Sequence, residues 1–154
     1  MFRFLLTVVL CLVSHEARSV IATGWTPCDA ANGEVVDVRV TPPSGDNDLV
    51  YRLRRGTNVT LHVDFNSFVA SETARAKSYA LVMRMPVSLT MPHDDICRGT
   101  GVLCPLEPGT TNKYTQPFEV KVTYPKVKVT VKWTAVDDKG DVMACAMIPV
   151  EIVD

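Results

Sequence analysis

The sequence predicts an all-β fold, an antiparallel sandwich of about seven short strands. Several segments alternate apolar and polar residues, the period of a strand with one buried and one solvated face. Clusters of Pro, Gly, Asp and Asn separate these segments at short intervals, as turns do. No segment has a convincing helical period, and no internal repeat is visible. Short strands with frequent turns are typical of two sheets packed face to face.

The first half of the chain contains four expected strands. Residues 34–40 are rich in valine, and residues 49–53 form a short apolar segment. Residues 58–65 alternate cleanly, which predicts one buried face. Residues 76–85 carry bulky apolar side chains on one parity. The side chains expected to point inward from the last two segments are Val59, Leu61, Val63, Phe65, Tyr79, Leu81, Met83 and Met85.

Three further strands are expected in the second half. Residues 118–124 and 126–135 alternate apolar residues with lysine, threonine or glutamate, and residues 142–153 carry apolar residues at every second position. The residues 137–141, which include Gly140, are expected to join the last two strands as a hairpin. The inward-pointing side chains include Phe118, Val120, Val131 and Trp133.

Residues 1–19 have the order of a secretory signal peptide: a basic start, an apolar run and then small residues. The apolar run Phe4 to Val13 is shorter than the roughly 20 residues that span a bilayer. The small residues of this segment are compatible with cleavage after Ser19 or after Ala22. The alternative to a signal peptide is a buried N-terminal helix. Residues 20–154 are then one secreted domain. Its 14 basic and 16 acidic residues, net −2, give no reason to expect nucleic acid as a partner.

Without the leader the chain has four cysteines, an even number that suits a disulfide-bonded secreted domain. They allow three pairings. The simplest is a local bridge between Cys97 and Cys104, across a Gly-rich loop, which leaves Cys28 to pair with Cys145. A zinc site needs Cys and His clustered at short spacing, and the histidines of the domain do not complete such a motif.

Asn58 begins an Asn-Val-Thr glycosylation sequon, on the outward face of its expected strand. The sequon agrees with a secretory route.

The chain contains no recognisable catalytic motif. There is no Gly-x-Ser-x-Gly elbow and no phosphate-binding glycine loop. His93-Asp94-Asp95 suits a metal or acid–base cluster by composition, but adjacent carboxylates in a loop more often serve turns. No enzymatic activity and no cofactor are therefore expected.

Basic residues form two groups whose role the sequence leaves open. Arg52, Arg54 and Arg55 lie near one strand end, and Lys126, Lys128 and Lys132 form a stripe on another strand. Such groups are commonly solvated faces. The alternative is contact with anionic lipid headgroups.

The order of motifs in the domain resembles the ML family of lipid-recognition domains, in particular its Niemann-Pick C2 branch; the family also includes the group 2 mite allergens. The residues that carry the resemblance are Cys28-Asp29-Ala30-Ala31-Asn32-Gly33, Val36, Val38, Val40-Thr41-Pro42, Arg55-Gly56, the strand to Phe65, Pro86-Val87, Cys97, Cys104-Pro105-Leu106, Tyr124-Pro125, Val129 to Trp133, Asp137-Asp138, Cys145-Ala146 and Ile148-Pro149-Val150.

The resemblance implies an immunoglobulin-like sandwich with an apolar pocket between its sheets. It also implies binding and transfer of a sterol or another hydrophobic lipid, outside cells or in the lysosomal lumen, by a monomer that meets a membrane surface or a lipid-accepting membrane protein. The alternative function is a secreted module that presents microbial lipid or a small hydrophobic signal to a receptor. Anionic ligands of that kind need several Lys or Arg side chains at the pocket entrance. Lys121 is the only basic residue next to the residues expected to border that entrance.

The resemblance also suggests which residues hold the lipid. Val87, Leu89, Val120 and Tyr124 are expected to border the entrance, and Leu81, Met83, Phe118 and Trp133 to line the interior. From the pattern alone, a closed core without a pocket is the commoner outcome, and the resemblance is what favours a pocket. The expected lipid-binding residues are Val59, Leu61, Val63, Phe65, Leu81, Met83, Val87, Leu89, Phe118, Val120, Tyr124, Val131 and Trp133.

Three departures from the family pattern stand out. The loop Pro42 to Tyr51 lacks the third disulfide that relatives usually have there. Leu89 and Ala146 stand where sterol-binding relatives have aromatic residues. We expect the loop to be less constrained and the pocket mouth to be wider.

Overall fold

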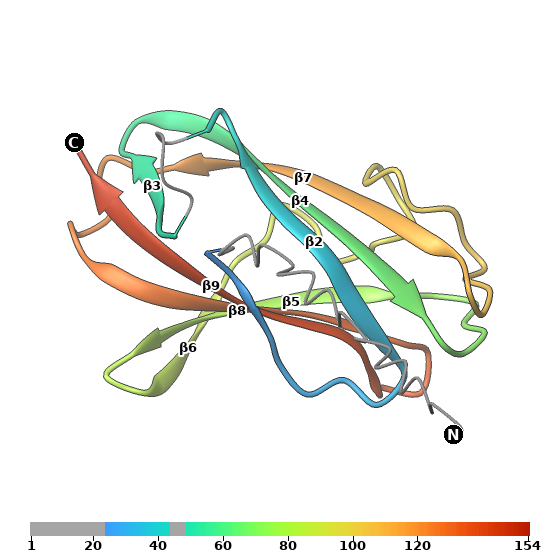
Figure 1. Ribbon diagram of the computed structural model, residues 1–154. Coiled ribbons are helices and arrows are strands. Elements are labelled where there is room, and N and C mark those ends of the chain that lie inside the picture. Colours follow the sequence, from blue (N-terminus) through green and yellow to red (C-terminus); the bar gives the residue numbers. More distant parts are fainter. Residues whose placement is uncertain (1–23, 44–48) are drawn as a thin grey trace, which may run out of the picture.

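The computed structural model describes residues 24–43 and 49–154, and in them the alternating segments pair into two stacked sheets (Figure 1). The leader over residues 1–19, its cleavage positions and part of the loop Pro42 to Tyr51 lie outside the described residues. None of the described residues belongs to a helix long and apolar enough to cross a membrane. The strands are β1 (Thr26–Pro27), β2 (Gly33–Thr41), β3 (Tyr51–Arg54), β4 (Thr57–Ser67), β5 (Arg75–Val82), β6 (Met85–Leu89), β7 (Thr111–Val120), β8 (Lys128–Val136) and β9 (Val142–Val153).

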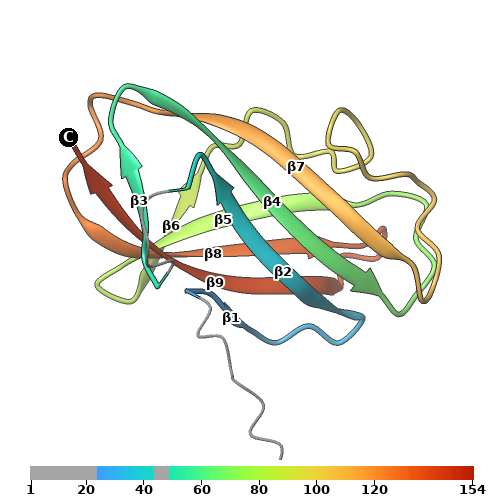
Figure 2. The ribbon, with the colours of Figure 1, turned by 45° about the horizontal axis from the view of Figure 1, so that its top comes forward.

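One sheet has the order β1-β9-β8-β5-β6, with β3 paired to β9, and the other has the order β2-β4-β7. All pairings are antiparallel except that of β3, which runs parallel to β9. The expectation of purely antiparallel sheets is wrong for this strand. Only the short turn of Arg55 and Gly56 separates β3 from β4, which belongs to the opposite sheet. Strand β3 must therefore run towards the start of β4, and this direction is parallel to β9. Figure 2 shows β3 beside the end of β9.

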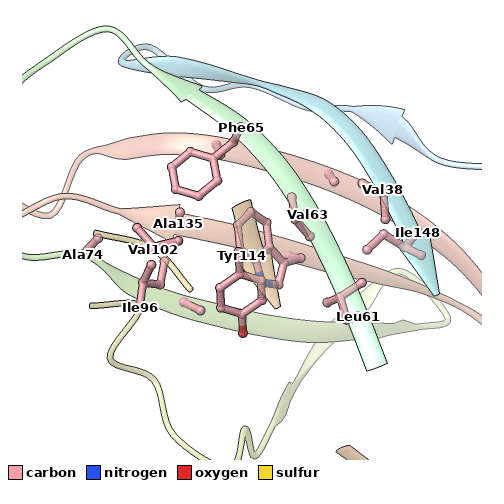
Figure 3. Packing of buried hydrophobic residues seen from close by; sticks show 14 of the residues in the cluster. Val38, Leu61, Val63, Phe65, Ala74, Ile96, Val102, Tyr114, Ala135 and Ile148 are labelled. Atoms are coloured by element: carbon pink, nitrogen blue, oxygen red, sulfur yellow. The ribbon is translucent and has the colours of Figure 1, made fainter. Parts of the chain in front are cut away.

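The inner faces of the sheets form one apolar core. On β4, Val63 lies opposite Tyr114 of β7 and Val38 of β2. On the other sheet, Trp133 of β8 lies opposite Ser78 of β5 and Ala146 of β9. Figure 3 shows side chains of both sheets meeting between the layers. The inward parity predicted for residues 58–65 is confirmed, since Val59, Leu61, Val63 and Phe65 are all buried.

Strand β7 begins seven residues earlier than the alternation predicts. It spans Thr111–Val120, so that Val122 and Tyr124 lie beyond its end and are exposed. The early part escaped the pattern because two of its inward-facing residues, Asn112 and Gln116, are polar. Their burial matters for the site described below.

The segment 76–85 is not one strand. Met83 and Arg84 both have positive φ, 50° and 67°, and form the two-residue turn of a hairpin between β5 and β6. Met83 therefore lies at the tip, 92% exposed, and does not line the interior. Positive φ in two such residues carries no sequence signal, because Asn or Gly usually occupies these positions.

The inward parity of β5 is also opposite to the prediction. Ala76, Ser78 and Ala80 are the buried residues, and Leu81 lies on the outer face opposite Thr130. The bulky indole of Trp133 lies directly opposite Ser78, and a small neighbour leaves it room. Leu81 is thus misassigned as an interior residue.

Two disulfides follow the simplest pairing. Cys28 just after β1 is bonded to Cys145 in β9, and the backbone N–H of Cys28 also donates to the Cys145 carbonyl at 3.0 Å. Cys97 is bonded to Cys104 in the connection between β6 and β7. That connection contributes its own buried residues to the core, among them Ile96 (Figure 3).

At Gly33 the backbone of β2 lies close to backbone atoms of both β9 and the neighbouring strand β4. A Cβ added there would lie 2.2 Å from the carbonyl oxygen of Met143 and 2.3 Å from that of Asn66. Backbone atoms on both sides cannot move aside cheaply, so this position requires glycine. The contact ties β2 to β9 at the end of the sandwich that carries the Cys28–Cys145 disulfide.

Asp137 organises the hairpin between β8 and β9. Its Oδ1 accepts hydrogen bonds from the backbone N–H groups of Lys139, 2.9 Å, and Asp141, 2.8 Å, and its Oδ2 accepts one from the Asn32 side chain at 3.1 Å. Burial pushes the pKa of Asp137 upward, but these hydrogen bonds outweigh it, so its pKa lies below the ordinary value. The carboxylate therefore stabilises the folded chain when it is ionised.

We expect Asp137→Asn to lower the free energy of unfolding by about 1–2 kcal/mol at pH 7, because charged acceptors form stronger hydrogen bonds. A carboxyl whose pKa is depressed by folding contributes stability above its unfolded pKa of about 3.9, and loses that contribution as the pH falls through the folded pKa. The difference in the free energy of unfolding between the native protein and the variant should therefore become smaller as the pH falls towards 3. Urea unfolding at several pH values measures it, with Asp29→Asn at an exposed position as control. A deficit that stays constant with pH would contradict the assignment.

Candidate functional site

The inner faces become accessible at the side of the sandwich where β6 faces the second half of β7. Val87 and Leu89 lie on β6 opposite Ala80 and Ser78, which places them on the inward side of the sheet, yet both are exposed. Strand β6 extends away from β7 in Figure 1. Apolar side chains that face inward at an open edge mark the place where an apolar molecule meets the core. We call this place the mouth.

The deeper border of the mouth comes from both sheets. Phe118 on β7 lies opposite Val59 on the inner face of its sheet and is half-buried. Val131 on β8 lies opposite Ala80 and is also half-buried. Of the expected entrance residues, Val87 and Leu89 are exposed on the inward side of β6, while Phe118 and Val131 are half-buried on the inner faces of β7 and β8.

Val120 does not border the entrance. It is fully buried beneath the turn into β4, where its carbonyl accepts a hydrogen bond from the backbone N–H of Gly56 at 2.6 Å. The end of β7 is capped by that turn, and so its last inward residue belongs to the core. Tyr124 follows the strand, and its carbonyl accepts a hydrogen bond from Arg55 at 3.3 Å. Its role at an entrance stays a prediction.

Aromatic residues fill the interior beyond the mouth. The rings of Tyr114 and Trp133 have centroids 5.1 Å apart, and those of Phe65 and Trp133 are 6.1 Å apart. Figure 3 shows Tyr114 between Ile96 and Leu61, with its hydroxyl oxygen directed away from β4. This group, together with Gln116, is called the floor of the site below. Trp133 is therefore an interior residue, as expected from the sequence.

The floor contains polar groups that are almost fully buried: the Tyr114 hydroxyl, the Gln116 amide and the Trp133 indole N–H. Gln116 Oε1 has no hydrogen-bond partner within the part of the chain that the structure describes. The three residues are 1%, 2% and 0% exposed. Burial raises the pKa of Tyr114 to about 12, against the opposing effect of a hydrogen bond with the Trp133 side chain. An unpaired buried polar group costs about 1–3 kcal/mol, so the Gln116 carbonyl oxygen is the unusual member of the floor. Sequence reasoning missed this group, whose only visible sign was the polar character of Tyr114 and Gln116.

Two shallow hollows of the described surface lie outside the space between the sheets. One is bordered by residues 126–128 and 151–154, and the other lies on the connection that carries Cys104. The facing side chains of the sheets pack against one another instead. A ligand that binds between the sheets therefore has to displace side chains near the mouth.

The tip of the β5–β6 hairpin is an exposed apolar surface next to the mouth. Met83 is 92% and Met85 71% exposed, and Val82 beside them is also exposed. Arg84 stands between the two methionines in the turn. Soluble proteins rarely expose neighbouring large apolar residues without an interaction that uses them.

Several of the remaining candidate groups have structural partners. Asp94 forms an ion pair with Arg75 at 2.9 Å, and Asp95 accepts a hydrogen bond from the Cys97 backbone N–H at 2.9 Å. Within residues 24–43 and 49–154, no group of three His, Cys, Asp or Glu residues is arranged to hold a metal ion. Lys126 pairs with Asp154 at 2.8 Å, and Lys128 with Glu151 at 3.9 Å.

Asn58 is exposed on the outer face of β4, opposite Glu119 of β7. That position gives a glycan room.

Comparisons with known proteins agree with this geometry. A family model described as the ML domain matches residues 22–152. The NPC intracellular cholesterol transporter 2 of Danio rerio is 31% identical over 153 residues, which are 99% of each chain. The ecdysteroid-regulated 16 kDa protein of Manduca sexta is 31% identical over 97% of this chain and 98% of its own length. The fold is shared with the crystal structure of a Niemann-Pick type C2 protein from the Japanese carpenter ant, with a TM-score of 0.78 at 21% identity over 84% of this chain and 98% of that one.

Proposed function

This chain belongs to the ML domain family, and from that premise we propose that it binds and transfers a sterol or another neutral hydrophobic lipid between its two sheets. Members of this family are lipid-binding proteins without enzymatic activity. The observation that carries the proposal is the mouth: Val87 and Leu89 face inward but are exposed, and Phe118 and Val131 continue their apolar surface towards the core.

Burial of apolar surface drives binding. Each Å² of apolar lipid surface removed from water contributes about 25 cal/mol before the costs of association. Because side chains fill the space between the sheets, the lipid enters by moving β6 and the residues of the mouth outward. Strand β6 is an edge strand that pairs only with β5 among the described residues, so it can move without breaking a second ladder.

A neutral lipid is favoured over an anionic one. Asp137 is the only charged residue among the buried ones of the described chain, and it lies at the hairpin between β8 and β9, away from the mouth. A phosphorylated or carboxylated ligand between the sheets would need Lys or Arg partners there. The alternative of a module that presents anionic microbial lipid finds no Lys or Arg among the described residues that point inward at the mouth, since Val87, Leu89, Phe118 and Val131 are all apolar.

Secretion is part of the proposal. Two disulfides suit an oxidising compartment such as the extracellular space. The predicted signal peptide over residues 1–19 supports the same route. Glycosylation of Asn58 and delivery to the lysosomal lumen are compatible with it.

The proposal is tested on the natively secreted protein. Mass spectrometry of an organic extract identifies the lipids that copurify with it, and a titration with a fluorescent sterol measures affinity. We expect a neutral lipid at close to one molecule per chain, and saturable sterol binding. An extract that contains only phosphorylated lipids, together with absent sterol binding, would overturn the proposal.

The exposed hairpin tip is expected to meet the lipid surface during transfer. Substitution of Met83 and Met85 by Asp should slow sterol transfer between neutral liposomes about tenfold or more, since two charges replace apolar side chains at a membrane interface. Affinity for sterol in solution should change less than twofold, because the tip lies outside the mouth. Leu103→Asp, at an equally exposed apolar position on another connection, is the control. Transfer that proceeds at the native rate would show that the tip has no such role.

A further inference from the structure

Resting on the proposed function, we propose that Arg55 and Asp154 form a polar strap at the end of the mouth, and that release of this strap sets how fast a lipid enters and leaves. The strap holds the loop of residues 121–127, which joins β7 to β8. Arg55 is a positioning residue in this proposal, because it acts on the loop and does not touch the lipid.

The loop joins the two strands that carry the deeper border of the mouth. Phe118 lies on β7 shortly before the loop begins, and Val131 lies on β8 shortly after it ends. These strands belong to different sheets, so the loop crosses from one sheet to the other at this end of the sandwich (Figure 2). A lipid that separates Phe118 from Val131 therefore has to move the loop as well.

The guanidinium group of Arg55 fastens the loop to its surroundings. Its Nη1 donates hydrogen bonds to the carbonyl oxygens of Val122, at 3.4 Å, and Tyr124, at 3.3 Å. Its Nη2 is paired with the carboxylate of Asp154, which also accepts a hydrogen bond from Lys126 Nζ at 2.8 Å. The backbone N–H of Arg55 donates to the Val153 carbonyl at 2.8 Å, which ties the same residue to the end of β9. The loop is thus held at alternate residues by two side chains from outside it.

The strap is an ion pair that water can reach. Hydrogen bonds from Lys126 and Arg55 hold the pKa of the Asp154 carboxyl below its ordinary value, so this group is ionised at neutral pH. The side chains of Arg55 and Asp154 are 29% and 61% exposed. Exposed ion pairs contribute little to stability and are screened by salt. The strap can therefore open and close without unfolding the sandwich.

The loop buries little of its own surface. Every residue from 121 to 127 is exposed, and Val122 is 66% exposed although it is apolar. Near β8 the Val127 carbonyl accepts a hydrogen bond from the Ile152 backbone N–H at 2.9 Å, which ties that end of the loop to β9. Segments with few buried contacts open at a low cost in free energy. The middle of the loop therefore depends on the strap for its position.

The test measures the rates at which a fluorescent sterol is taken up from methyl-β-cyclodextrin and released to it, so that no membrane contact is involved. In Asp154→Ala, which truncates an exposed side chain and should fold normally, we expect both rates to rise about threefold, a size typical of a surface ion pair. The affinity should change less than twofold, because entry and release are accelerated together. Asp94→Ala is the matched control: it removes a comparably exposed carboxylate from its 2.9 Å ion pair with Arg75 and should retain the native rates.

Salt provides a second readout, which a merely structural role would not move. Sodium chloride at about 1 M screens charges beyond about 3 Å, so it should accelerate release from the native protein about threefold and release from Asp154→Ala much less. Arg55→Ala, which also frees the two loop carbonyls, should release sterol at least as fast as Asp154→Ala. Arg55→Lys keeps the positive charge and should restore part of the difference.

The possible results separate the strap from the proposed function. Native rates in Asp154→Ala, or a salt response equal to that of the native protein, would overturn the strap and leave sterol binding intact. Faster release with an unchanged rate of entry would also overturn it, because the carboxylate would then stabilise the bound state and not control access. If the native protein binds no sterol, the proposed function falls and the strap falls with it.

Discussion

Replacing Cys28 and Cys145 together by alanine is expected to lower the free energy of unfolding by about 4–5 kcal/mol, a large part of the stability of a typical domain. The two residues are 117 positions apart, so their bond restricts nearly the whole unfolded chain. It also holds β1 against β9, since the only neighbour of that two-residue strand in the described sheets is β9. Urea unfolding of the oxidised proteins measures the loss.

The second disulfide is the matched comparison. Cys97 and Cys104 are only 7 positions apart, and the same loop-closure argument gives about 2–3 kcal/mol for their removal. The long bridge should therefore cost more than the short one. Equal losses would mean that the bonds act mainly through local packing in the folded state, for which the buried Ile96 and Val102 beside the short bridge are the first candidates.

Val131→Phe is expected to weaken sterol binding about 30-fold or more. Val131 faces inward between Ala80 of β5 and Ile148 of β9, and its side chain is half-buried at the mouth. A phenyl ring there occupies space that the lipid needs, and forcing extra atoms into a packed site costs about 1–3 kcal/mol. Because the position is partly open, the ring should tilt outward in the ligand-free protein, and the melting temperature should change by only a few degrees.

Thr130→Phe provides the control, since Thr130 is the preceding residue on the same strand and points to the outer face beside Leu81 and Pro149. It adds similar bulk to the opposite side of the sheet. Fluorescent sterol titrations of the two variants and the native protein make the comparison. An affinity of Val131→Phe within threefold of the native value would place the lipid elsewhere.

Much of the fold could be predicted from the alternation of residues. The strands β4, β8 and β9 lie where the pattern places them, and β9 has the predicted bounds Val142–Val153. In β4 and β8, one face is apolar and the other polar, so a shift of one residue would bury charged side chains. Strands whose buried face is made of small or polar residues gave a weaker signal, which is why the start of β7 was missed.

The candidate site was predicted less well. Val87 and Leu89 lie at the mouth, but Met83 lies at a hairpin tip, Leu81 points outward and Val120 is sealed in the core. These errors share a cause: hydrophobicity identifies residues that favour burial but does not say which neighbour covers them. Ser78 and Ala80 face the interior because the larger side chains of Trp133 and Val131, their partners on β8, fill the neighbouring space.

The amino-acid sequence is therefore sufficient for the family, the two-sheet architecture, the simplest disulfide pairing and the apolar faces of the long strands, because each follows from local periodicity or from motif order. The mouth, the parity of β5, the parallel pairing of β3 and the burial of polar groups in the floor depend on the packed molecule. They arise from contacts between residues far apart in the chain, such as Trp133 with Tyr114. Whether an apolar side chain is covered, or a polar one left without a partner, is a property of those contacts and not of any single stretch of sequence.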